Sequence, residues 1–284
     1  MRILAATDFS TRAQRGLRRA GLLARDRGAE LALVHVVDND RPPDLVALER
    51  READRILGEQ IDAVAQLREL PSHALVVEGD PFDGILRAAT SMRADLIVMG
   101  GYRKQFLREI FVGTTLERVI RTGPFPVLMT NNEAIRPYET ALAAVDMSEP
   151  SMNAMRTAMA LGLPGGARLA FVHAFQPVAK GKLLYAGLAR DAVDGYVTDE
   201  RELATRELLT FLDENEFDHH ASAMLIEEGG PFEVISKAVG HFKPDVLIIG
   251  TRGRSRMASA LLGSVAEHVL RSLNIDILAV PPLR

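Results

Sequence analysis

A glycine-rich loop follows the apolar run "DVLIIG" in the last part of the chain, and its residue types are suited to binding an anion. Gly250 and Gly253 come first, and Gly263 and Ser264 open the next helical stretch. A glycine lets the backbone approach a ligand closely or adopt a positive φ, and its amide can form part of an anion-binding nest. A helix N-terminus also attracts anions. The spacing predicts a loop that leaves a strand, surrounds a phosphate chain and returns at a helix.

The same residues allow a purely structural interpretation, in which the glycines shape a turn and Ser264 caps the helix. We favour phosphate binding because the loop connects a strand to a helix and faces Asp146, which ends another predicted strand. Ligands of open parallel sheets bind beyond the carboxyl ends of the strands. Arg252, Arg254 and Arg256 could neutralise phosphates or could simply be solvated.

An earlier copy of the loop differs at one position. The segment "DLIVMGGYRKQFLREIFVGTTLERV" places Gly100 and Gly113 at the same separation, but Arg103 occupies the position of Gly253. If that position needs a positive φ, a residue other than glycine costs about 1 kcal/mol there. The arginine side chain could also fill the space of a phosphate. We therefore expect the first copy to keep the fold while its site is empty.

The two loops belong to a duplication that covers most of the 284 residues. "ILAATDFS" matches "ALAAVDMS", and "VVEGDPFDGIL" matches "LIEEGGPFEVI". Asp8 and Asp146 are 138 positions apart, whereas Gly100 and Gly250 are 150 apart, so the second copy carries twelve extra residues between its second and third strands.

Each copy alternates short apolar runs with longer amphipathic stretches, as in a parallel sheet covered by helices. In the first copy we expect strands near residues 2–8, 31–37, 74–78, 95–99 and 126–130, and helices near 11–27, 44–68, 82–93 and 114–122. The predicted fold class is α/β, with two tandem doubly wound domains, each a five-stranded parallel sheet flanked by helices. The domains are expected at residues 1–130 and 139–284, with a polar hinge at 131–138.

The last strand of each copy, "PFPVLMT" and "NIDILAV", would be an apolar sheet edge. Because an uncovered apolar edge promotes aggregation, we expect the two edges to pair and form an internal pseudo-dimer. The sequence leaves open whether the chain also forms a homodimer.

The extra residues of the second copy, at 176–197, leave the second strand at the edge where a ligand is expected. Lys180, Lys182 and Tyr185 could meet a phosphate or stack on a base. Because long loops are often lids, we expect this segment to act as a flap over the second site, with disorder as the competing explanation.

Composition narrows the class of protein. A net charge of −4 gives no reason to expect a nucleic-acid partner. The absence of cysteine excludes disulfides and thiolate chemistry, and no apolar run is long enough to cross a bilayer. The start "MRILAATDFS" has the pattern of a strand and not of a signal peptide, so we expect a cytoplasmic protein.

The combined pattern resembles the universal stress protein family, whose nucleotide-binding members carry G-x-x-G-x9-G-[ST] after the fourth strand. The resemblance covers nearly the whole chain apart from the hinge and the insertion, and it implies an adenine nucleotide alpha hydrolase-like fold. It also implies ATP, with or without Mg²⁺, in the second domain, with the aspartate and the second strand at adenosine and the glycine loop at the phosphates. The implied site residues are Ala144, Val145, Asp146, His173, Ala174, Gly250, Thr251, Gly253, Arg254, Gly263, Ser264 and Val265.

Other polar residues support weaker interpretations. His35 and His173 lie inside apolar strands and are expected to be satisfied core residues, and "DHH" at 218–220 lacks the cysteine or carboxylate cluster that would complete a metal site. We expect an ATP-binding regulatory protein of the stress response, at most a weak ATPase. A hydrolase or nucleotidyl-transfer enzyme of the same architecture, and a scaffold without nucleotide, are the alternatives. No G-x-x-x-x-G-K-[ST] segment and no evident base supports the enzyme.

Overall fold

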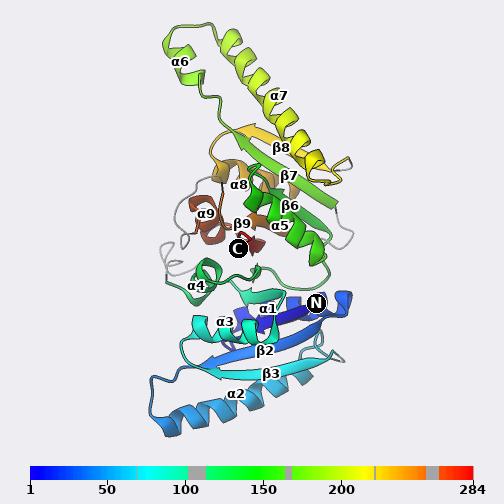
Figure 1. Cartoon of the computed structure of the whole chain (residues 1–284), viewed down its shortest axis with the longest axis vertical. Coiled ribbons are helices and arrows are strands. Elements are labelled where there is room, and N and C mark those ends of the chain that lie inside the picture. The colour runs from blue at the N-terminus through cyan, green and yellow to red at the C-terminus, as the bar shows by residue number, and fades with distance from the viewer. Residues whose placement is uncertain (69, 102–112, 164–167, 221, 254–261, 284) are drawn as a thin grey trace.

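The computed structural model describes all residues except 69, 102–112, 164–167, 221, 254–261 and 284. Its strands form one ten-stranded sheet in the order β3-β2-β1-β4-β5-β10-β9-β6-β7-β8. Helices cover both faces of this sheet, and the first and second halves of the chain lie end to end along the long axis of the molecule (Figure 1). The expected α/β fold with two tandem, helix-covered domains is confirmed, and the five parallel strands of each domain are joined into one sheet.

The first half of the chain alternates strands and helices as the sequence predicts. Its elements are β1 (Arg2–Ala6), α1 (Thr11–Arg27), β2 (Glu30–Val37), α2 (Pro43–Ala63), β3 (Ser72–Glu78), α3 (Pro81–Met92), β4 (Leu96–Gly100), α4 (Thr115–Thr122) and β5 (Val127–Thr130). The largest difference is α2, which ends at Ala63 and not near residue 68. The chain then packs over Gly21 of α1, where a Cβ would stand 2.7 Å from the Gln66 carbonyl oxygen, and so buries Leu67 completely.

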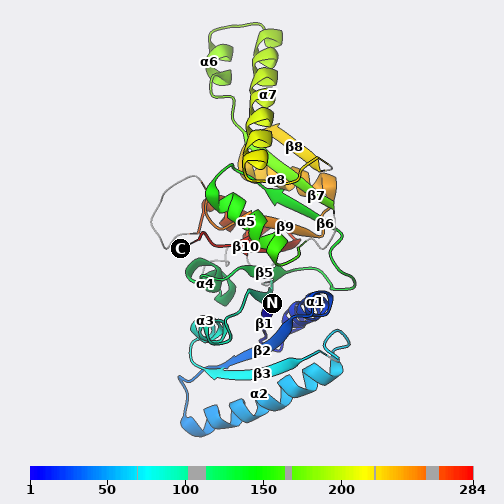
Figure 2. The same ribbon diagram turned by 45° about the vertical axis from the view of Figure 1, so that its right-hand side comes forward.

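The second half repeats this order with one added helix. Its elements are β6 (Thr140–Ala144), α5 (Glu149–Ala160), β7 (Arg168–Phe175), α6 (Lys180–Tyr185), α7 (Arg190–Glu214), β8 (Ala223–Glu228), α8 (Pro231–Phe242), β9 (Val246–Gly250), α9 (Ser264–Ser272) and β10 (Asp276–Val280). The short α6 and the first turns of α7 form an arm that projects beyond the sheet (Figure 1; Figure 2). None of the helices described is long and apolar enough to cross a membrane.

The last strands of the two halves pair with each other, as predicted. β5 and β10 run antiparallel, with Leu128 opposite Leu278 at the centre of the register, whereas the other described strand pairs are parallel. The pairing joins the two hydrophobic layers as well, because the core on each face of the sheet contains residues of both halves. The internal pseudo-dimer therefore has a continuous core.

The hinge segment, residues 131–138, is fastened to both halves around a buried carboxylate. Asp276 is 0% exposed; it accepts hydrogen bonds from the Asn131 N–H at 2.7 Å and the Tyr138 hydroxyl at 2.7 Å. The Arg19 guanidinium of α1 lies 3.6 Å from the same carboxylate and 3.9 Å above the Tyr138 ring. Burial and the neighbouring Asp276 charge both raise the pKa of Tyr138 well above its usual value, so its hydroxyl stays a donor.

Candidate functional site

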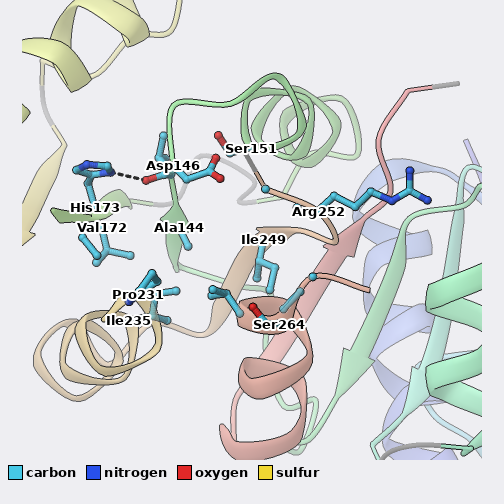
Figure 3. A pocket seen from close by; sticks show the side chains of 17 residues that line it. Ala144, Asp146, Ser151, Val172, His173, Pro231, Ile235, Ile249, Arg252 and Ser264 are labelled. Atoms are coloured by element: carbon cyan, nitrogen blue, oxygen red, sulfur yellow. Dashed lines mark hydrogen bonds between the residues drawn. The ribbon is translucent and has the colours of Figure 1, made fainter. Parts of the chain in front are cut away.

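A cavity of about 230 Å³ opens in the second half at the carboxyl ends of β6, β7 and β9. The N-terminal ends of α8 and α9 complete its walls. Figure 3 shows Val172, Pro231 and Ile235 grouped at one end, with Ser264 and Arg252 toward the other. The position agrees with the rule that open parallel sheets bind ligands beyond the carboxyl ends of their strands.

The cavity brings together most of the residues that the sequence singles out. Its lining includes Ala144, Val145, Asp146, His173, Ala174, Gly250, Gly253, Gly263, Ser264 and Val265. Thr251 lies behind the lining: its N–H donates to the Val280 carbonyl at 2.8 Å and its carbonyl accepts from the Gly263 N–H at 2.9 Å. These two bonds close the base of the glycine loop on β10. Arg254 lies outside the described residues.

Part of the cavity wall was not predicted from the sequence. The additional lining residues are Ser151, Val172, Pro231, Ile235, Ile249, Arg252 and Ala266, of which Arg252 had been interpreted as either a phosphate partner or a solvated side chain. The repeat itself offered a signal for Pro231, because "GDPF" and "GGPF" recur at the start of the helix after the third strand. That helix begins at the same sheet edge as the predicted site, so its first turn had to lie nearby.

Asp146 is held in place by the turn that follows β6. Its Oδ1 accepts the Ser148 N–H at 3.1 Å and also contacts the Ser148 hydroxyl, while Met147 adopts a φ of 56°. This turn between β6 and α5 fixes the carboxylate at the cavity wall.

The glycines of the loop are required for close packing and not for a positive φ, which corrects the sequence argument. Neither Gly250 nor Gly253 lies in the left-handed region. A Cβ on Gly253 would stand 2.7 Å from the Asp146 Oδ2, and one on Gly250 would stand 3.0 Å from the Pro150 carbonyl oxygen. The loop lies directly against Asp146 and the start of α5, so a side chain at either position would require its neighbour to shift.

His173 is a satisfied core residue, as predicted. It is 6% exposed, and its Nδ1 lies 2.7 Å from the Val145 carbonyl oxygen (dashed line in Figure 3). The pairing of β6 with β7 ends at Ala144 and Val172, but β7 continues to Phe175 with β8 on its other side. Beyond Val172, the edge of β7 at Ala174 therefore has no strand partner among the described residues, and Ala174 lines the cavity.

The start of α9 is open toward the cavity. Gly263 is the N-cap residue, and among the described residues no side-chain hydrogen bond caps this helix, so the alternative interpretation of Ser264 as its cap is not supported. Ser264 is the first residue of α9 and is exposed. The first N–H groups of the helix and the Ser264 hydroxyl are thus placed where an anion would find several donors.

The first half carries a corresponding cavity of about 340 Å³, lined among others by Asp8, Arg12, His35 and Thr114. Here the helix start is closed: Thr114 Oγ accepts the Glu117 N–H at 3.1 Å, and the Gly113 N–H donates to the Glu117 carboxylate at 3.2 Å. Arg103, on which the predicted difference between the copies depends, lies outside the described residues. Among the described residues, the two cavities therefore differ at the helix start, where a phosphate chain would be expected: side chains bond to N–H groups at α4, whereas no side-chain cap is found at α9.

The insertion does not cover the cavity in this structure. None of the described lining residues comes from positions 176–197, and the Lys180 ammonium binds the Glu228 carboxylate at 2.7 Å. Tyr185 is 95% exposed on the projecting arm. The expected flap is instead α6 and the beginning of α7, and the length of α7 directs them away from the sheet (Figure 2).

The described residues contain no group of three or more side chains that could hold a metal ion. Within the "DHH" segment, His219 is largely buried and its Nε2 lies 2.9 Å from the Asp213 carboxylate. The contact fastens the turn after α7.

The comparison with known proteins agrees with the duplicated fold. The sequence model of the universal stress protein family matches residues 1–131 and again residues 137–281. The chain belongs to the universal stress protein family. It is a tandem member, with a first and a second domain that correspond to the two matches.

Individual relatives cover different parts of this universal stress protein. The universal stress protein in the QAH/OAS sulfhydrylase 3' region of Thermus aquaticus is 34% identical over 136 residues, which are 45% of this chain and 96% of that relative. Universal stress protein E of Escherichia coli K12 is 26% identical over 215 residues, 71% of this chain, and the match spans 65% of that relative, somewhat less than two thirds of its length. A universal stress protein from Archaeoglobus fulgidus shares the fold with a TM-score of 0.71 at 18% identity, over 99% of this chain and 98% of that one.

Proposed function

We propose that this universal stress protein is a nucleotide-responsive regulatory protein whose second domain binds ATP. The observation that carries the proposal is the combination, in one cavity, of an apolar slot, a fixed carboxylate and an open helix N-terminus. Each part matches one chemical part of ATP, and their order along the cavity matches the order of those parts in the nucleotide.

The apolar end is suited to the adenine ring. Val172, Pro231 and Ile235 provide the surface on which a base can be buried, and the unpaired edge of β7 at Ala174 can hydrogen-bond to the edge of the base. Asp146 lies between this end and the loop, where its carboxylate can accept hydrogen bonds from ribose hydroxyls. A cavity of about 230 Å³ is smaller than the roughly 300–1,000 Å³ of most ligand pockets, so it accommodates the nucleoside while the phosphates extend outward.

The phosphates extend toward the glycine loop and α9. The N–H groups at the start of α9 and the Ser264 hydroxyl provide donors, and Arg252 provides a positive charge at the same side. Mg²⁺ would be held chiefly by phosphate oxygens and water, because Asp146 is the one carboxylate among the described lining residues.

A binding role suits these residues better than fast hydrolysis. Asp146 already accepts the Ser148 N–H and lies beside Gly253, so it is occupied in positioning and not poised to activate water. The loop base is hydrogen-bonded to β10 through Thr251 and Val280, and β10 pairs with β5 of the first domain. ATP binding at the glycine loop can therefore affect the β5–β10 junction of the two domains through β10. This connection is the basis of the regulatory role that we propose.

The proposal is tested with one variant in each domain. We would measure binding of labelled ATP by equilibrium dialysis to the wild type, to Asp146→Ala and to the matched control Asp8→Ala, and analyse the recovered nucleotide for ADP. ATP binding that is lost with Asp146→Ala and kept with Asp8→Ala supports the proposal. No ATP binding to the wild type would favour the scaffold alternative, and rapid ADP production would favour the enzyme.

A further inference from the structure

Exposed apolar side chains are concentrated in and beside the arm formed by α6 and the first turns of α7. Among the described residues, eleven large apolar side chains are exposed, and five of them lie within one stretch: Val178, Leu184, Tyr185, Leu188 and Leu203. Both views show the arm projecting beyond the sheet, away from the helices that cover it (Figure 1; Figure 2). Single exposed apolar side chains need no explanation, but a cluster of them marks an interaction surface.

The outer face of α7 continues this surface. Ala192, Gly195, Asp199 and Leu203 follow one another at intervals of three or four residues, so they share one face of the helix, and all four are exposed. None of them is among the residues that α7 buries against the domain. A Cβ on Gly195 would meet no atom within 4 Å, so the middle of this face leaves room for the close approach of another helix.

The distribution of charge indicates what covers the arm. Residues 176–190 contain three cations and no carboxylate, whereas residues 191–202 contain five carboxylates and one cation. Among the described residues, no ion pair involves Lys182, Arg190 or Asp199. A surface that carries both signs at separate places is complementary to itself when two copies meet in opposite directions. An anionic bilayer suits it less well, because the carboxylates next to the tip would be repelled.

We propose that the arm is a dimerisation surface, on which α7 of one copy packs antiparallel to α7 of a second copy about a two-fold axis near Gly195. With a rise of about 1.5 Å per residue, Arg190 lies about 7 Å and Asp199 about 6 Å from Gly195 along the helix, on opposite sides of it. The axis therefore brings Arg190 level with Asp199 of the second copy. It also brings the apolar tip around Leu188 level with Leu203 of the second copy.

This contact is limited to the arm, where the segment from Arg190 to Leu203 extends about 20 Å. An interface of this length is shorter than those of most permanent dimers, so we expect a dissociation constant in the micromolar range. The inference does not depend on the proposed function, because no described residue that lines the ATP cavity comes from the arm.

The test is sedimentation velocity of the full chain without nucleotide over a range of protein concentrations. We expect a reversible dimer that Arg190→Glu and Asp199→Arg each weaken at least about tenfold, because the two-fold axis repeats each lost pair. The double variant should restore association, since it rebuilds the pair with the charges exchanged. Melting curves show that the variants are folded.

An apolar pair of variants provides the matched control. Leu203→Ser should also weaken the dimer at least about tenfold, because it removes the apolar contact with the tip of the second copy. Ile135→Ser changes an apolar side chain that is 83% exposed on the hinge, outside the arm, and should leave the dimer unchanged.

Three results would overturn the inference. A chain that stays monomeric at every concentration has no such surface, and a dimer that ignores the arm variants uses another one. Single charge variants that weaken the dimer without rescue in the double variant exclude the antiparallel arrangement. If the monomer instead sediments with phosphatidylserine-containing vesicles and Lys182→Glu prevents this, a bilayer and not a second copy covers the arm.

Discussion

Gly253 and Asp146 approach so closely that a Cβ on the glycine would stand 2.7 Å from the Asp146 Oδ2. The other carboxylate oxygen accepts the Ser148 N–H, so a shift of Asp146 away from a side chain at position 253 would also disturb this hydrogen bond. The glycine of this loop therefore allows the close approach of the carboxylate. The equivalent residue of the first copy is Arg103, which lies outside the described residues.

The first prediction follows from this contact. Gly253→Ala should displace the Asp146 carboxylate and weaken ATP binding about tenfold, the equivalent of one hydrogen bond to a charged group. Gly240→Ala is the matched control, because a Cβ on Gly240 of α8 would meet no atom within 4 Å. The control should keep its ATP affinity and gain about 0.5–1 kcal/mol of stability. Unchanged ATP affinity in Gly253→Ala would contradict the assigned role of the contact.

Much of the fold could be predicted from the sequence because its signals are local and occur twice. Apolar runs of strand length alternate with amphipathic helices, and the equivalent glycines and aspartates fix the register of the two copies. The β5–β10 pairing could also be predicted, because each copy of the repeat ends in an apolar strand, and an unpaired apolar sheet edge would promote aggregation. These arguments need no knowledge of tertiary contacts.

The remainder depended on contacts that the sequence does not reveal. The insertion contains Gly181 and Gly195 and was interpreted as a loop, yet both glycines lie in helices with open space around them. The sequence allowed a positive φ at Gly253, whereas the structure has none there and instead packs this glycine against Asp146, 107 residues earlier. By contrast, the closure of α4 by Glu117 could have been found in the sequence, because Thr114 and Glu117 have the S/T-x-x-E spacing of a capping box.

The second prediction concerns the junction of the domains. Arg19→Ala should destabilise the protein by about 3–5 kcal/mol, because it leaves the fully buried Asp276 carboxylate without its cation. Arg18→Ala, on the same helix, removes only an exposed ion pair with Glu133 and should cost at most about 1 kcal/mol. Urea unfolding of both variants measures the difference, and equal effects would show that the buried cluster does not fasten the domains.

The third prediction is a dependence on pH at Asp245. Burial by itself would raise its pKa, but the N–H groups of Glu139 and Thr140 and the Arg136 guanidinium together lower the pKa below its usual value. The stabilisation is therefore present above the unfolded pKa of about 3.9 and is lost as the pH falls through the lower folded value. Asp245→Asn should lower the free energy of unfolding near neutral pH, and the difference from wild type should shrink below about pH 4. A difference that is constant across this range would contradict the shift.

The fourth prediction concerns the arm formed by α6 and the start of α7. Because the arm contributes nothing to the described cavity lining, its hydrogen exchange should be the same with and without ATP. The segments around Asp146 and Gly250–Gly253 should gain protection when ATP is added. Protection of the arm by ATP would show that it closes over the site in the bound state.

The central claim is that the two domains differ in their capacity to bind ATP, and calorimetric titration of the full chain with ATP tests it most directly. The account predicts a single binding event with one ATP per chain, which Asp146→Ala removes and Asp8→Ala preserves. Two equal sites per chain would contradict it, and so would a single site that is lost in Asp8→Ala and kept in Asp146→Ala.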